Sequence, residues 1–340
     1  MSHVLREQKR KKGFFDFFPA PHFLFLTTVG VSLSDKELHL IEFRQSTHAG
    51  ELVLSEWNEQ PLPPGAISAG YINDIPAVVK AISELRKKNP FSYVRATLPE
   101  EKAYLFTVEV EKEPFESLRD RVAFTIEENV PVTLAKSVFD FDIIGETKGR
   151  STIKVAVCVL PTKSVAFYTQ IFQDAGATPI SFDVESQAIG RAVIPAGDRR
   201  THLIINIGEE KTGLYVVEDE VVQFSSTPPY GTRSDESGYT DLLSLKAEIR
   251  KVFAFWNTRL DKEGIPEKKI EKVLLTGAEA KKDDFINELM ADIDVPYALA
   301  NVWSNAFSVE EYPPDIPYDE SLRYAAAIGA ALPKKEPRYV

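Results

Sequence analysis

Two short polar turns, each between two predicted strands, hold the residues whose types and spacing suggest chemistry. The first turn contains Ser34, Asp35 and Lys36, and the second contains Gly208, Lys211 and Thr212. Backbone N–H groups of a tight turn, together with a nearby ammonium group, can bind an anion. The alternative is an ordinary solvated turn, and the residue types alone favour that alternative.

The two turns belong to an internal repeat. Residues 31–34 followed by 40–42 resemble residues 205–208 followed by 216–218, because each copy consists of a strand, a polar turn and a returning strand. The copies lie near the starts of the two halves of the chain. They predict two facing halves with a cleft between them, a common place for a ligand.

Alternating strand and helix patterns surround these turns, and they predict an α/β fold. Strands are expected at residues 29–31, 38–43, 93–98, 103–110, 139–144, 153–160, 202–207, 214–217, 221–225 and 273–275. Helices are expected at residues 75–85, 115–126, 164–175, 245–260, 285–293 and 318–332. Gly176 suits a left-handed cap after the third helix. Ala325, Ala326, Gly329 and Ala330 give the last helix a small face for close packing.

Composition excludes several classes of protein. The formal net charge is −11, which argues against general nucleic-acid binding, because phosphate contacts need a basic surface. The single cysteine, Cys158, excludes an intrachain disulfide and lies in an apolar run that predicts a buried thiol. Metal-ligand spacing of Cys and His, a Ser-His-Asp arrangement, a Walker loop and a dinucleotide fingerprint are all absent from the sequence. His39 and His202 fall in predicted strands with no acid at a suggestive spacing.

The start of the chain is basic and then aromatic. The candidate docking residues are Lys9, Arg10, Lys11, Lys12, Phe14, Phe15, Phe17 and Phe18. The apolar stretch is short and is broken by Asp16, Pro19 and Pro21, so we expect neither a signal peptide nor a transmembrane helix. Residues 1–22 are either a disordered tail with a hydrophobic docking patch or a weak anchor to anionic lipid. We expect a cytoplasmic protein, and the second alternative would make it peripheral to a membrane.

A set of short motifs resembles the actin-like ATPase superfamily and, within it, the PilM family of type IV pilus assembly proteins. The motifs are residues 29–31, 62–67 (Leu-Pro-Pro-Gly-Ala-Ile), 98–99, 126–131, 175–188, 204–208, 245–250 and 274–277. The resemblance runs from about residue 29 to residue 332. It implies an actin-like (ribonuclease H-like) two-domain fold. The implied parts are a tail (1–26), subdomain 1A (27–92), an inserted SHS2-type subdomain 1C (93–175), a return to 1A (176–199), subdomain 2A with a reduced 2B (200–310) and a C-terminal helix with its tail (311–340).

The resemblance also implies ATP between the two hairpins, where the family pattern is Asp-x-Gly. The first hairpin reads Ser32-Leu33-Ser34 and the second reads Asn206-Ile207-Gly208, so neither supplies the carboxylate that holds the water shell of Mg²⁺. The adenosine-side motif after the strand at 273–275 is a partial match, Thr276-Gly277-Ala278. We expect a degraded nucleotide site, no catalytic residues, no metal and no required cofactor.

Two further features bear on this site. Only residues 228–244 lie where relatives carry subdomain 2B, so one wall of an ATP cleft should be missing. Asp183 and Glu185 are either a remnant water-orienting group or, as the sequence favours, a polar helix N-terminus stabilised by the helix dipole.

The sequence therefore predicts a non-catalytic scaffold. The family resemblance implies that it binds the cytoplasmic tail of a bitopic, PilN-like inner-membrane protein in a groove formed near residues 62–72 and by the strands of 1C. Self-association is a further possible contact, and nucleic acid is not expected. Two alternatives stay open: an ATP-binding actin-like switch or filament protein, and a peripheral membrane protein that acts through its own N-terminus.

Overall fold

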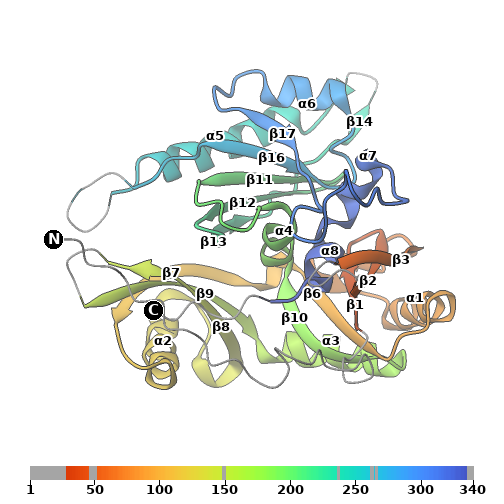
Figure 1. Ribbon diagram of the computed structural model, residues 1–340, viewed down its shortest axis with the longest axis horizontal. Coiled ribbons are helices and arrows are strands. Elements are labelled where there is room, and N and C mark those ends of the chain that lie inside the picture. Colours follow the sequence, from red (N-terminus) through yellow and green to blue (C-terminus); the bar gives the residue numbers. More distant parts are fainter. Residues whose placement is uncertain are drawn as a thin grey trace.

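In the computed structural model, three sheets and their helices surround two short central helices (Figure 1). The structure describes residues 28–45, 52–147, 151–235, 238–260, 264 and 267–334. The N-terminal docking residues named above lie outside these ranges. Among the described residues, no helix combines the length and the apolar character needed to cross a bilayer.

The first sheet has the strand order β10-β6-β1-β2-β3. Its strands are β1 (Thr28–Leu33), β2 (Glu37–Gln45), β3 (Leu52–Pro61), β6 (Tyr93–Leu98) and β10 (Thr178–Val184). Helices α1 (Ile75–Lys88) and α3 (Thr162–Asp174) pack against each other beside this sheet. Asp74 starts α1 by accepting a hydrogen bond from the N–H of Ala77 at 3.0 Å, and Gly176, at φ +78°, follows the end of α3 as expected.

The second sheet repeats this topology in the order β13-β12-β11-β16-β17. Its strands are β11 (His202–Ile207), β12 (Thr212–Glu218), β13 (Val221–Ser226), β16 (Lys272–Thr276) and β17 (Tyr297–Leu299). In both sheets the leading hairpin is antiparallel and the two strands on its other side are parallel. Thus β1 corresponds to β11 and β2 to β12, which confirms the internal repeat. Helices α5 (Leu242–Asn257) and α6 (Asp283–Met290) pack together beside this sheet.

The third sheet has three strands in the order β7-β9-β8. It contains β7 (Tyr104–Glu111), β8 (Ser137–Glu146) and β9 (Thr152–Pro161), with helix α2 (Phe115–Asn129) against β7. Apolar residues that alternate along β9 are buried and form a separate core with Leu118, Val122 and Ile126 of α2. Cys158 on β9 is buried, as expected.

Some elements differ from the sequence prediction. The strands β3 and β17 were missed, and residues 178–184 form a full strand. Where subdomain 2B was expected to be reduced, the described chain between β13 and α5 forms only the small hairpin β14 (Ser234–Asp235) and β15 (Gly238–Tyr239). A second small hairpin, β4 (Ile67–Ser68) and β5 (Tyr71–Ile72), lies just before α1.

The predicted last helix, residues 318–332, is interrupted. It forms α7 (Tyr318–Ser321), a 3₁₀ turn at Leu322–Tyr324 and α8 (Ala325–Ala331). The carbonyl oxygen of Leu322 accepts hydrogen bonds from Thr276 Oγ1 at 3.0 Å and from the N–H of Gly277 at 3.2 Å. Because this carbonyl bonds to another segment, the α-helical pattern breaks there.

Helices α8 and α4 (Glu185–Val193) lie at the centre of the molecule, between the first and second sheets (Figure 1). Helix α8 packs on β1, β2, β6 and α4, and α4 in turn contacts β10, β12 and β13. A side chain at Gly30 would meet the backbone of Ala327, and one at Gly329 would meet the carbonyl oxygen of Ala188. The two glycines therefore let these backbones approach more closely than any other residue would.

Substituting Gly329 should destabilise the whole fold. Gly329→Ala places a methyl group inside the carbonyl group of Ala188, so we expect a loss of at least about 2 kcal/mol in the free energy of unfolding by urea. Gly145→Ala on β8 is the matched control, because no atom lies within 4 Å of the added carbon, and its effect should stay within about 0.5 kcal/mol. Equal stability of the two variants would contradict the close packing of α8 on α4.

Candidate functional site

The two predicted turns face each other across the boundary between the first and second sheets. In each turn a backbone N–H closes the bend on a carbonyl oxygen three residues later, Ser34 on Glu37 and Gly208 on Lys211, both at 3.0 Å. The internal repeat thus produces two matching turns. Thr212, predicted to lie in the second turn, is instead the first residue of β12 and is fully buried.

Charged side chains of the protein itself bridge the two turns. Lys36 forms an ion pair with Glu209, and Lys211 reaches Glu101 at 2.6 Å and Asp35 at 3.3 Å. Burial alone would lower the pKa of Lys211, but the attraction of Glu101, Glu185 and Asp35 raises it instead. Lys211, in the second sheet's turn, therefore keeps its positive charge between carboxylates that follow strands of the first sheet. We call the first sheet with its helices one lobe and the second sheet with its helices the other.

Glu185, the first residue of α4, lies behind this cluster. Its carboxylate accepts hydrogen bonds from Asn206 Nδ2 at 3.1 Å and from the hydroxyl of Tyr215 at 3.3 Å. Burial raises the pKa of Glu185 to about 7, against the lowering effect of Lys211. The glutamate sits at a helix N-terminus, as the sequence favoured, and it also contacts the second predicted hairpin through Asn206.

The third predicted segment, residues 276–278, lies beside Asn206. Gly277 has φ +100°, and a Cβ there would lie 2.7 Å from Asn206 Oδ1 and closer still to the backbone of Ile207. The structure therefore brings the predicted hairpin and adenosine-side positions together. The cavity that remains among Ser34, Asp35, Glu101, Tyr168, Glu185 and Lys211 measures about 30 Å³. Ser32 is buried on β1, outside the lining of this cavity.

A second cluster, Glu37, His39 and Glu59, has its candidate ligand atoms within 4.8 Å of one another. The sequence prediction missed that Glu37 partners His39, whose Nε2 lies 3.1 Å from Glu37 Oε1. The guanidinium group of Arg323 already lies 3.3 Å from Glu59 and 4.0 Å from Glu37. A cation of the protein itself is thus already paired with both carboxylates of this cluster.

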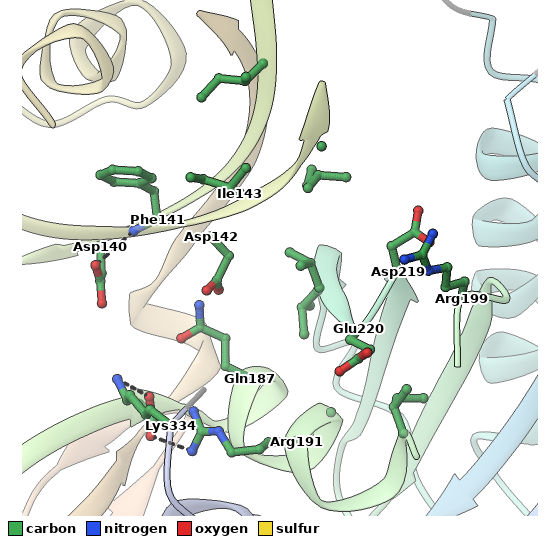
Figure 2. A pocket seen from close by; sticks show the side chains of 18 of the residues that line it. Asp140, Phe141, Asp142, Ile143, Gln187, Arg191, Arg199, Asp219, Glu220 and Lys334 are labelled. Carbon is green, nitrogen blue, oxygen red and sulfur yellow. Dashed lines mark hydrogen bonds and ion pairs between the residues drawn. The ribbon is translucent and has the colours of Figure 1, made fainter. Parts of the chain in front are cut away.

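A groove of about 720 Å³, which we call the β8–α4 groove, lies away from the two turns. One wall is residues 140–146 of β8, the floor includes Asp183 and residues of α4, and the other wall is residues 219–222 at the start of β13. Figure 2 shows Asp142 and Gln187 pointing toward each other across the space, with Glu220 and Arg199 on the opposite wall. Residues 62–72, predicted to form part of the partner groove, do not line it, and Ile67 lines the small cavity instead.

The groove is lined by apolar side chains, by one edge of strand β8 and by charged side chains. β8 is the last strand of the third sheet, so one edge of it pairs with no described strand. Ile143, Ile153 and Val222 supply apolar surface. At the floor, burial would raise the pKa of Asp183, but ion pairs with Arg191 at 3.1 Å and Lys334 at 2.7 Å lower it overall. This set of features suits an extended peptide better than a small molecule.

Sequence reasoning predicted the strands of this wall but none of its groove-facing side chains. The alternation Asp140-Phe141-Asp142-Ile143 was a signal, because it places two carboxylates on one face of β8. Gln187, Arg191 and Lys334 line the groove only because α4 and the last described residues pack near β8. A local sequence pattern does not show which distant elements pack together.

Comparison with known proteins gives both a family and a fold. The model of the family described as type IV pilus assembly protein PilM matches residues 30–251. No curated protein matches the sequence. A chain of the PilM–PilN type IV pilus biogenesis complex has the same fold, with a TM-score of 0.73, 19% identity and coverage of 91% of this chain and 99% of that one.

Weaker likenesses extend to other structures. The ethanolamine utilization protein EutJ from Carboxydothermus hydrogenoformans has a TM-score of 0.47 at 13% identity, covering 89% of this chain and 88% of that one. The cytoplasmic domain of EpsL, an inner-membrane component of the Vibrio cholerae type II secretion system, has a TM-score of 0.45 at 12% identity, covering 88% and 94%. The expected actin-like α/β fold is confirmed.

Glu185 should make stability depend on pH. Its folded pKa of about 7 lies above the ordinary value of 4.5, so ionisation favours the unfolded chain. The stabilising contribution is fully present below about pH 4.5 and is lost as the pH rises through 7. Relative to the wild type, Glu185→Gln should gain about 1–3 kcal/mol in unfolding free energy between pH 5 and pH 8. The exposed control Glu311→Gln should gain nothing, and a pH-independent difference for Glu185→Gln would refute the assignment.

Proposed function

Because this chain belongs to the family of type IV pilus assembly proteins PilM, we propose that it is a non-catalytic scaffold of a type IV pilus machine at the inner membrane. In this proposal it holds the extended cytoplasmic tail of a bitopic, PilN-like membrane protein in the β8–α4 groove. The observation that carries the proposal is the groove itself, about 720 Å³ of space beside an open strand edge.

The shape of the groove favours a peptide. A strand edge offers backbone N–H and C=O groups to an added strand, and adjacent apolar side chains select its residues. β8 spans 10 residues, so a partner segment of several residues could pair along it at about 3.3 Å per residue. One solved structure with the same fold is a complex of PilM with PilN, which is consistent with a membrane-protein tail as the ligand.

The cleft between the turns supports a scaffold rather than an ATPase. A cavity of about 30 Å³ has room for about one or two water molecules, whereas drug-sized ligands occupy pockets of about 300–1,000 Å³. Lys36 pairs with Glu209 of the opposite turn, and Lys211 pairs with Asp35 of the opposite turn and with Glu101, so internal charges stand where phosphate and metal would be needed. We therefore propose that the lobes close on each other without nucleotide.

A groove-blocking variant tests the partner site. Gln187→Arg adds a longer, charged side chain to the floor of the groove, and we expect at least about tenfold weaker binding of a labelled peptide copied from a PilN-type cytoplasmic tail, measured by fluorescence polarisation. Gln170→Arg on α3, an exposed glutamine outside the groove lining, is the matched control and should bind like the wild type. Unchanged binding by Gln187→Arg would place the tail elsewhere.

A nucleotide titration tests the proposal about the cleft. Addition of Mg·ATP at millimolar concentration should leave the melting temperature unchanged within about 1 °C, because a ligand raises it only by binding the folded state. Magnesium pyrophosphate serves as the control for non-specific anion effects. A saturable rise with Mg·ATP that disappears in Asn206→Ala or Gly277→Ala would instead support an ATP-dependent switch.

A further inference from the structure

The last described residues lead the chain into the β8–α4 groove. Arg95 donates a hydrogen bond to the carbonyl oxygen of Leu332 at 3.2 Å, which fixes the chain just after α8. Two residues later, Lys334 lines the groove and pairs with Asp183 on its floor at 2.7 Å. Figure 2 shows Lys334 below Asp140 and beside Arg191, at the floor of the groove.

Two carboxylates on β8 face this point of entry. Asp140 and Asp142 are two residues apart, so they share one face of the strand, and both are exposed to the groove. The two cations whose charge acts on Asp142, Lys334 and Arg191, are both in ion pairs with Asp183. The pKa of Asp142 is raised, first by desolvation within the groove and then by Asp140, while Lys334 and Arg191 oppose the rise only in part. The negative charges of Asp140 and Asp142 are therefore not fully neutralised by Lys334 and Arg191.

The segment that follows Lys334 has the complementary charge and enough length. Residues 335–340 read Lys-Glu-Pro-Arg-Tyr-Val, with two cations and one anion. Six extended residues reach about 20 Å, which is more than half the length of a 10-residue strand. Tyr339 and Val340 add apolar groups that suit the isoleucines of the groove.

We propose that residues 335–340 dock along the open edge of β8, with Lys335 and Arg338 neutralising Asp140 and Asp142. The chain thereby occupies its own groove. If the partner tail binds there, as proposed above, it must displace this segment, and the segment then acts as an internal competitor that weakens partner binding. The docking of the segment does not depend on the partner, whereas the competition rests on the proposed function.

A disulfide trap tests the docking without any partner. In a Cys158→Ala background, Ile143→Cys combined with Tyr339→Cys should form an intramolecular disulfide under mild oxidation, detected by mass spectrometry, and this pair leaves both carboxylates of β8 in place. The control pairs Tyr339→Cys with Asp219→Cys on the opposite wall of the groove. We expect the β8 pair to cross-link at least about tenfold faster than the control pair, and equal rates would overturn the proposal.

Hydrogen exchange provides a second readout in the native chain. Removal of residues 335–340, or the length-preserving double variant Lys335→Ser/Arg338→Ser, should speed exchange of β8 amides by about tenfold while amides of β11 stay unchanged. Asp140→Asn/Asp142→Asn should have the same effect, and Asp283→Asn/Asp284→Asn on α6 should have none. Unaltered β8 exchange in all the segment variants would overturn the docking.

Partner affinity separates the two claims. Truncation should tighten binding of the labelled tail peptide several-fold if the segment competes for the groove. Failure of the peptide to bind at all counts against the proposed function, because the disulfide and exchange measurements report on the segment alone.

Discussion

Helices α4 and α8 approach each other backbone to backbone at one point, because Gly329 lies against the carbonyl group of Ala188. The same is true of α8 and β1, where Gly30 lies against the backbone of Ala327. These two contacts place the last helix of the chain on the first strand and connect both to the helix that contacts the second sheet. The cleft and the groove both depend on this arrangement, since residues of α4 line both of them.

In the cleft, the close approach of the two lobes brings opposite charges together. Exposed pairs such as Lys36 with Glu209 contribute little to stability, generally under about 1 kcal/mol. The side chain of Lys211 is less exposed than that of Lys36. Removal of its charge would leave the carboxylates of Asp35 and Glu101 without their cation. Glu185 lies behind these charges, and burial raises the pKa of its carboxyl group to about 7. The cleft is therefore a junction between lobes whose electrostatics are satisfied mostly from within the chain.

The groove has the opposite character. Its floor is neutralised by the ion pairs of Asp183, but its β8 wall carries two acids beside an open strand edge. Unpaired strand edges tend to acquire partners, and natural proteins usually cover or charge them. An open edge within a hollow of about 720 Å³ is thus the part of this surface best prepared for a peptide, whether from another protein or from the same chain.

The sequence by itself determined the α/β class, most of the strands and helices and the internal repeat, because these follow from local hydrophobic periodicity and turn residues. It also identified the turn residues 34–36 and 208–211, since both turns stand out as polar bends between apolar strands. The resemblance to a family extended this to the actin-like fold. Strands β3 and β17 escaped detection because one is half-exposed and mixed in character and the other has three residues.

Only the tertiary structure decided what these turns and strands do. The partners of Lys211 lie 110 and 176 positions away in the sequence, and those distances carry no local signal. The break in the last helix depends on two donors from residues 276 and 277. The groove forms where β8, α4 and the start of β13 meet, and these three elements are far apart in the sequence. Local patterns specify elements, whereas sites between elements depend on how closely backbones approach.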